Sequence, residues 1–270
     1  MQEMRTTLTK KKNIKAAFFD IDGTLFSHRT LCVPESTLRA LRCLAERGIL
    51  CVIATGRHIS ELAELDFLNY GFDAYITLNG QLCLNNKLEI VYGTPMKGES
   101  LEGMLRFFIG GEIPSILISK DRMYINYIND DVRRAHHDIH TNIPVIGEYA
   151  GEPIYMGVIY CTKEKEREAS VIENLPGCNI TRWSRHGIDI VPSGGDKAAR
   201  IRRYLDIMGL SREETIAFGD GENDIKMLKF AGIGIALGNA EEAVKAEADY
   251  VTADIDDNGV YKALKYFGII

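Results

Sequence analysis

The feature that most constrains this chain is an apolar run that ends in two carboxylates. Residues 14–19 have the nearly continuous apolar composition of a strand buried on both faces, and Asp20 and Asp22 follow directly. Because side chains alternate along an extended backbone, both carboxylates can point to the same side where the strand ends. Two like charges that close need a cation or a shared proton. A strand followed by an ordinary Asp-Gly turn would show the same residues, so this segment alone does not decide.

Strand and helix patterns alternate in the first and last thirds of the chain. Such an order predicts a parallel sheet with right-handed crossovers, and we expect both thirds to form one doubly wound α/β sheet with ligands at the carboxyl ends of its strands. We expect strands at 14–19, 49–54, 75–78, 215–218, 233–236 and 250–251, and helices from Pro34, at 59–69, 196–208 and 241–247, and from Glu222.

The middle of the chain has a different rhythm. Paired strands separated by short polar turns indicate hairpins, which together with helices describe a mixed α+β module. We expect hairpins at 82–84 with 88–91 and at 116–119 with 124–127, helices at 131–140 and 164–174, and strands at 155–160, 179–183 and 188–191. The prediction is therefore a core of residues 1–82 and 190–270 with an inserted domain at 83–189.

Composition excludes several classes of function. The net charge of −6 gives no support to nucleic-acid binding, which needs a basic face. No apolar run approaches the roughly 18 residues of a membrane span, and the first residues lack a signal-peptide core. The six cysteines include no Cys-x-x-Cys pair, which favours free thiols in a reducing compartment. We therefore expect a cytoplasmic protein, monomeric or weakly dimeric, with neither nucleic acid nor membrane as partner.

Four segments carry chemistry at compatible positions. Besides the first strand end, Thr55-Gly56 follows the second strand, Lys197 lies at a helix start, and Gly219–Asp224 follows the strand at 215–218. Each has an ordinary alternative, because such residues are frequent in turns, helix caps and solvent-exposed first turns. Turns and caps, however, do not predict that three of the four segments follow parallel strands.

These four motifs, in this order, resemble those of the haloacid dehalogenase (HAD) superfamily of phosphotransferases. Ile76–Gly80 further resembles a segment of the Cof-type sugar phosphatases. About thirty residues separate Leu25 from Thr55, which leaves room for one crossover helix, whereas about 140 separate Thr55 from Lys197. The resemblance therefore implies a cap of the second (C2) class, inserted after the third strand.

The resemblance also assigns roles in a Mg²⁺-dependent phosphatase that acts on small phosphorylated metabolites, with sugar phosphates expected. Asp20 would be the nucleophile and Asp22 the general acid–base. The residues implied for the metal are Asp20, Asp22 through its carbonyl, Asp220 and Asp224, and those for the phosphoryl group are Thr55, Gly56, Lys197 and Asn223. A phosphomutase and a phospho-accepting regulatory domain remain alternatives.

Specificity is expected from the inserted domain. Arg57, Asn79 and Arg185 are candidate substrate contacts, and Gln81 stands where the family often has a small residue. His136 and His140, four apart on an expected helix, invite a zinc interpretation, but no third ligand is near them. We therefore favour a packing or surface role for that helix.

Overall fold

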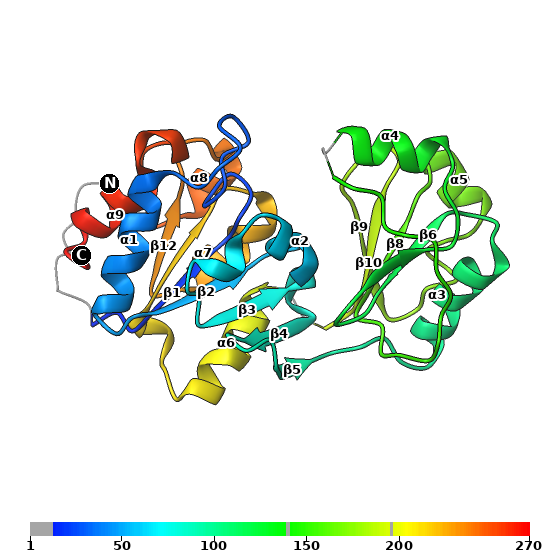
Figure 1. The fold of residues 1–270 in the computed structure, drawn as a ribbon, viewed down its shortest axis with the longest axis horizontal. Helices are drawn as coiled ribbons and strands as arrows, with labels where there is room; N and C mark the ends of the chain where they lie inside the picture. Colours follow the sequence, from blue (N-terminus) through cyan, green and yellow to red (C-terminus); the bar gives the residue numbers. More distant parts are fainter. Residues whose placement is uncertain (1–12, 139–140, 195–196) are drawn as a thin grey trace. The chain divides into compact units, whose positions relative to one another are not determined.

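The computed structural model describes residues 13–138, 141–194 and 197–270, which form two compact units (Figure 1). The first unit comprises residues 13–56, 65–89 and 197–270, and the second comprises 57–64, 90–138 and 141–194. No helix among the described residues is both long and apolar enough to cross a membrane.

The first unit is built on the predicted doubly wound sheet. Its strands run in the order β13-β12-β11-β1-β2-β3-β4, with every pair from β13 to β3 parallel and β3–β4 antiparallel. Along the chain the strands are β1 (Ala16–Phe19), β2 (Leu50–Ala54), β3 (Ala74–Thr77), β4 (Leu82–Asn85), β11 (Thr215–Gly219), β12 (Ile233–Ala236) and β13 (Tyr250–Val251). Strand β5 (Ile90–Gly93) follows β4 in the chain and belongs to the second unit.

Strand β1 lies inside this sheet, between β11 and β2, and is buried on both faces. Phe19 stacks on Phe218 of β11 with ring centroids 5.1 Å apart, and Phe18 meets Tyr204 edge-on at 6.1 Å. Both faces of β1 therefore bury aromatic rings, which explains why its sequence is continuously apolar and does not alternate.

Helices connect the parallel strands and pack against the sheet, as α1 does on β2 and α7 on β12. The helices α1 and α9 pack together (Figure 1), and α6 packs against α7. The helical segments that accompany the first unit are α1 (Glu35–Glu46), η2 (Phe67–Asn69), η3 (Leu78–Gly80), α6 (Lys197–Met208), η4 (Arg212–Glu214), η5 (Glu222–Asp224), α7 (Ile225–Phe230), α8 (Glu242–Glu247), η6 (Ile255–Asp257) and α9 (Gly259–Tyr266).

The second unit is a mixed α+β domain around a five-stranded antiparallel sheet. The strand order is β7-β6-β8-β10-β9, and the core packs Met104, Leu117 and Ile190 among other buried apolar side chains. Its elements are α2 (Ile59–Glu64), α3 (Glu99–Gly110), β6 (Ser115–Ile118), β7 (Met123–Ile125), α4 (Asp130–Asp138), β8 (Met156–Ile159), α5 (Lys163–Glu168), β9 (Cys178–Arg182) and β10 (Ile188–Pro192).

Several helices differ from expectation. Helices α3 and α9 have no counterpart among the expected elements, and the helix expected at 59–69 is divided into α2 and η2. The helix expected at 164–174 ends at Glu168. Ser170 adopts a left-handed φ of 48°, which ends the helix, and the Asn174 side chain donates to the Ser170 carbonyl at 2.9 Å.

The unit boundaries also differ from the predicted 1–82, 83–189 and 190–270. Strand β4 pairs with β3 and stays with the first unit, whereas β10 pairs with β8 and β9 and carries residues up to 194 into the second. Residues 57–64 join the second unit, where His58 Nε2 lies 3.1 Å from the Ser119 carbonyl and 3.0 Å from that of Lys120.

The approach of α7 to β12 gives a stability prediction. A Cβ at Gly234 would lie 2.3 Å from the Leu228 carbonyl oxygen, whereas a Cβ at Gly110 meets nothing within 4 Å. We expect Gly234→Ala to lower the free energy of unfolding by about 2 kcal/mol or more, because backbone must move. The control, Gly110→Ala, should be neutral or stabilising by up to ~1 kcal/mol. Urea unfolding tests both, and equal stability of the two variants would contradict this packing.

Candidate active site

The candidate site lies at the carboxyl ends of three adjacent strands. Asp20 directly follows β1, Thr55 follows β2 and Asp220 follows β11. Because Phe19 pairs with Ile53 on one side and with Phe218 on the other, the three strand ends lie next to one another in the sheet. The topology therefore brings together side chains that are up to 200 residues apart in sequence.

A buried lysine joins two carboxylates at this edge. Lys197 Nζ lies 2.7 Å from Asp20 Oδ1 and 2.6 Å from Asp224 Oδ1, and the Lys197 side chain is only 2% exposed. Burial alone would lower the pKa of the lysine, but the two carboxylates outweigh it and raise that pKa. Lys197 is therefore a permanent cation.

The surroundings of Asp20 disfavour its charged form even though Lys197 is close. Burial, followed by the nearby Asp224 carboxylate, raises the pKa of Asp20 well above its ordinary value, although Lys197 opposes the shift. A further positive charge at this point would lower that pKa and stabilise the ionised carboxylate.

Asp220 is fixed by the loop that follows β1. Thr24 Oγ1 donates to Asp220 Oδ1 at 2.7 Å. Gly23 has a φ of +75°, and a Cβ there would lie 2.1 Å from Asp220 Oδ2, so only glycine allows this approach. Burial, opposed by the Thr24 hydroxyl, raises the pKa of Asp220 to about 6.

Asp224 folds back over the end of β11. Its Oδ2 accepts from the backbone N–H groups of Asp220 and Gly221, each at 3.1 Å. One carboxylate oxygen each of Asp20, Asp220 and Asp224 lies within 4.8 Å of the others. This all-oxygen donor set, with raised pKa values at Asp20 and Asp220, fits a hard divalent cation.

Thr55 and Gly56 lie beside the turn that follows β3. Thr55 is buried, its N–H donates to the Ile76 carbonyl at 2.9 Å, and its own carbonyl accepts from the Asn79 N–H at 3.1 Å. The Asn79 side chain faces Gly56, since a Cβ at Gly56 would lie 3.2 Å from Asn79 Oδ1.

Asp22 and Asn223 lie at the margin of this cluster. Asp22 is half-buried and its Oδ1 lies 3.3 Å from Nε2 of His28, a neighbour that the sequence analysis did not single out. Asn223 is exposed, and its side chain lies over Gly221, where a Cβ would be 2.6 Å from Asn223 Oδ1.

Known proteins match this chain over most of its length. The family model described as haloacid dehalogenase-like hydrolase matches residues 17–264. The chain belongs to this HAD family. Its structure superimposes on that of the HAD subclass IIB sugar phosphatase BT4131 with a TM-score of 0.79 and 38% identity, covering 95% of this chain and 100% of that one.

Two further relatives are phosphatases. The structure of BT1666 from Bacteroides thetaiotaomicron, a HAD phosphatase, gives a TM-score of 0.83 at 32% identity over 95% of this chain and 96% of that chain. The Bacillus subtilis (strain 168) 5-amino-6-(5-phospho-D-ribitylamino)uracil phosphatase YitU is 28% identical over 93% of this chain and 96% of its own length. These relatives confirm the predicted α/β fold with an inserted cap, and the predicted phosphoric monoester hydrolase.

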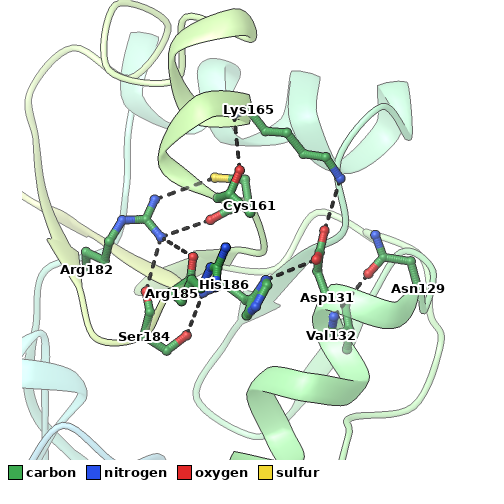
Figure 2. Close-up of polar contacts among 10 residues, drawn as sticks. Asn129, Asp131, Val132, Cys161, Lys165, Arg182, Ser184, Arg185 and His186 are labelled. Atoms are coloured by element: carbon green, nitrogen blue, oxygen red, sulfur yellow. Dashed lines mark hydrogen bonds and ion pairs between the residues drawn. The ribbon is translucent and has the colours of Figure 1, made fainter.

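Two candidate substrate residues of this HAD enzyme belong to the second unit. Arg57 Nη1 lies 3.5 Å from Glu61 Oε1, at the start of α2. Arg185 is exposed in the loop between β9 and β10, and its carbonyl accepts from Arg182 at 3.1 Å (Figure 2). A role for either arginine in substrate binding stays a prediction.

The loop that carries Arg185 is held by a polar network. Arg182 also donates to the carbonyls of Cys161 at 2.9 Å and Ser184 at 3.1 Å, and His186 Nδ1 lies 3.0 Å from Asp131 Oδ1 (Figure 2). This network ties the loop to both α4 and the chain after β8.

His136 is not available as a zinc ligand. Both ring nitrogens of His136 are engaged, Nδ1 with Thr141 Oγ1 at 2.9 Å and Nε2 with the Tyr160 hydroxyl at 2.6 Å, which is the packing role that we favoured. His140 lies outside the described residues.

One residue of the site was missed by the sequence analysis. Asn239, after β12, donates through Nδ2 to the Gly23 carbonyl at 2.7 Å and lies 3.5 Å from Asp220 Oδ2, while its Oδ1 accepts from the Ile255 N–H at 3.0 Å. Asn239 therefore holds in place the loop that contacts Asp220. Only its position just after a parallel strand could have indicated this.

The raised pKa of Asp220 gives a pH-dependent prediction. The folded state holds the Asp220 proton up to about pH 6, whereas the ordinary value is 3.8. The metal-free protein therefore loses stability as the pH rises through this window, and the cost is complete above it. Asn at this position removes the charge and still accepts from Thr24.

We therefore expect Asp220→Asn to raise the free energy of unfolding by about 2 kcal/mol near about pH 8 in chelator, and to have no effect near about pH 4. Urea unfolding at both values measures this. The control is Asp257→Asn, which changes an exposed ion pair and should shift stability by less than about 1 kcal/mol. A less stable Asp220→Asn variant near the higher pH would contradict the interpretation.

Proposed function

We propose that this HAD enzyme is a Mg²⁺-dependent phosphatase that hydrolyses phosphate monoesters of small metabolites, sugar phosphates first among them. The observation that carries the proposal is the buried cluster in which Lys197 and three aspartates surround the end of β1. The name of BT4131, a sugar phosphatase, supports the substrate class.

The first half-reaction is an in-line displacement at phosphorus. The Asp20 carboxylate attacks, an Asp20–phosphorus ester bond forms, and the bond to the leaving alcohol breaks. Asp22 donates its proton to the leaving oxygen, so the alcohol departs neutral. Lys197 neutralises charge on Asp20 and on the transferred phosphoryl group, and Thr55, the Gly56 amide and Asn223 bind the phosphoryl oxygens.

The second half-reaction hydrolyses the aspartyl-phosphate. Asp22, now ionised, takes a proton from a water molecule that attacks the same phosphorus atom. The bond to Asp20 breaks and inorganic phosphate leaves, so the carboxylate is regenerated. Asp20, Asp220, Asp224 and the Asp22 carbonyl would hold Mg²⁺, which supplies charge neutralisation at the phosphoryl group.

The inserted module, a C2-class cap in this proposal, supplies most of the specificity because the first unit contacts mainly the phosphoryl group. Arg57, Asn79 and Arg185 are the candidate contacts to the rest of the substrate. We place the enzyme in the cytoplasm, as a monomer or weak dimer.

Asp20→Asn should abolish turnover because an amide is not a competent nucleophile for phosphorus. The measurement is release of inorganic phosphate with Mg²⁺ present, together with circular dichroism to establish folding. Asp257→Asn serves as the control and should keep normal activity. Near-normal activity of Asp20→Asn would refute its role as nucleophile.

Asp22→Asn should reduce kcat/KM, which reports the step in which the alcohol leaves, by at least about 10²-fold for alkyl phosphates, the usual contribution of general acid–base catalysis. The loss should be smaller for p-nitrophenyl phosphate, whose leaving group needs no proton. Comparing the two substrates measures this. An equal loss on both would remove Asp22 from the role of acid.

The proposed substrate class is tested by a panel of sugar phosphates, nucleotides, flavin mononucleotide and pyridoxal phosphate, with Mg²⁺ and with chelator. We expect the highest kcat/KM for a sugar phosphate and no activity in chelator. An isomeric product without phosphate release would identify a mutase, and a long-lived phosphoprotein would identify a regulatory domain; either would refute the phosphatase.

A further inference from the structure

The turn that follows β3 has an unusual backbone. Leu78, Asn79 and Gly80 adopt left-handed φ values of 55°, 54° and 92° in succession. This conformation is unfavourable for Leu78, whereas asparagine tolerates it better than most residues with side chains. Such a backbone persists only where surrounding structure holds it, and it occurs often at functional sites.

The turn lies against the proposed phosphate-binding end of β2. The Asn79 N–H donates to the Thr55 carbonyl at 3.1 Å, and the Asn79 side chain faces Gly56 at a distance that leaves little room for a Cβ. The conformation of the turn therefore determines where the Thr55-Gly56 backbone lies.

Arg200, on α6, packs against the Leu78–Gly80 turn. Its Cγ would lie 2.3 Å from a Cβ at Gly80, so the arginine stem occupies the space that a side chain there would need. Arg200 Nη2 donates to Gln81 Oε1 at 3.3 Å, and both side chains are buried. The buried side chains of Arg200 and Gln81 are thus hydrogen-bonded to each other at the end of the turn.

Arg200 stands one helical turn after Lys197 on α6. The same turn of helix therefore holds Asp20 and Asp224 through Lys197 and the Leu78–Gln81 turn through Arg200. Gln81, considered from the sequence for substrate contact, has no exposed surface and instead accepts from Arg200.

We propose that Arg200 is a positioning residue that, through Gly80 and Gln81, keeps Asn79 against Gly56 and so fixes the Thr55-Gly56 phosphate site relative to Asp20. The inference rests on the proposed function, which makes Thr55 and Gly56 phosphate ligands. It adds the Arg200–Gln81 pair, which contacts no substrate, to the determinants of phosphate affinity.

The test compares Arg200→Met, Gln81→Met and the double variant with the unmodified protein. Methionine keeps the side-chain volume and removes the hydrogen bond. The readouts are kcat, KM and the inhibition constant of inorganic phosphate, with p-nitrophenyl phosphate as substrate and Mg²⁺ present. The control is Arg203→Met, which removes an exposed arginine from the same helix.

We expect each single variant to weaken inhibition by inorganic phosphate about tenfold and to raise KM in parallel, because the phosphate site loses its alignment. The inhibition constant of phosphate for the double variant should be no higher than that for Arg200→Met, since both changes remove the same Arg200–Gln81 hydrogen bond. Arg200→Lys should recover part of the loss. Arg203→Met should behave like the unmodified protein.

Several outcomes would overturn the inference. Unchanged phosphate inhibition in Arg200→Met, with a lowered melting temperature alone, would mean that the pair only stabilises the fold. Multiplying effects in the double variant would mean that the two residues act separately. If Arg200→Met does not fold, Gln81→Met decides by itself. An unmodified protein without phosphatase activity would refute the proposed function together with this inference, whereas an active enzyme indifferent to both changes refutes the inference alone.

Discussion

The ion pairs of Lys197 with Asp20 and Asp224 are the interaction on which the rest of the structure depends. Burying such charges costs several kcal/mol per ion, and removing one partner of a buried pair typically costs about 3–5 kcal/mol because the other charge stays unpaired. These contacts join the end of β1, the start of α6 and the segment after β11. Burial and Asp224 raise the pKa of Asp20 more than Lys197 lowers it, so a divalent cation at this point would stabilise the ionised carboxylate.

Irregular backbone at the strand ends gives the site its shape. Gly23 allows the loop after β1 to approach Asp220, and Asn239 braces that loop from the end of β12. The left-handed turn at Leu78–Gly80 does the same for Gly56 from the end of β3. Regular strands supply the common edge, but the positions of the individual groups come from these turns. Stability and function are therefore coupled here, since these turns lie directly beside the proposed metal and phosphate residues.

Local patterns predicted the strands of the first unit but not its last helix, α9. Apolar runs that end in Asp20, Thr55 and Asp220 indicate parallel strands, and the carboxyl ends of such strands meet at one edge, so the proximity of these three residues follows from topology. The expected roles of Lys197 and Asp224 came from the resemblance to the HAD motifs. Contacts across long sequence separations were not predictable. Thr24 with Asp220, Asn239 with Gly23 and Arg200 with Gln81 depend on exact strand ends and loop conformations. Helix α3 was missed, and its sequence contains Gly103 and ends in Gly110, residues that weaken a helical pattern. The observed unit boundaries differ from the predicted ones because β4 pairs with β3 and β10 pairs with β8, and the sequence alone does not reveal these pairings.

The central claim is that Asp20 carries the phosphoryl group. The most direct measurement is to incubate Asp22→Asn with p-nitrophenyl phosphate and Mg²⁺, quench in acid, and map the peptides by mass spectrometry. This substrate can phosphorylate the enzyme without a general acid, and the lost base slows hydrolysis, so the intermediate should accumulate. The account predicts a phosphoryl adduct on Asp20 that is absent from Asp20→Asn. An adduct on another residue, or turnover with no adduct at any time, would contradict it.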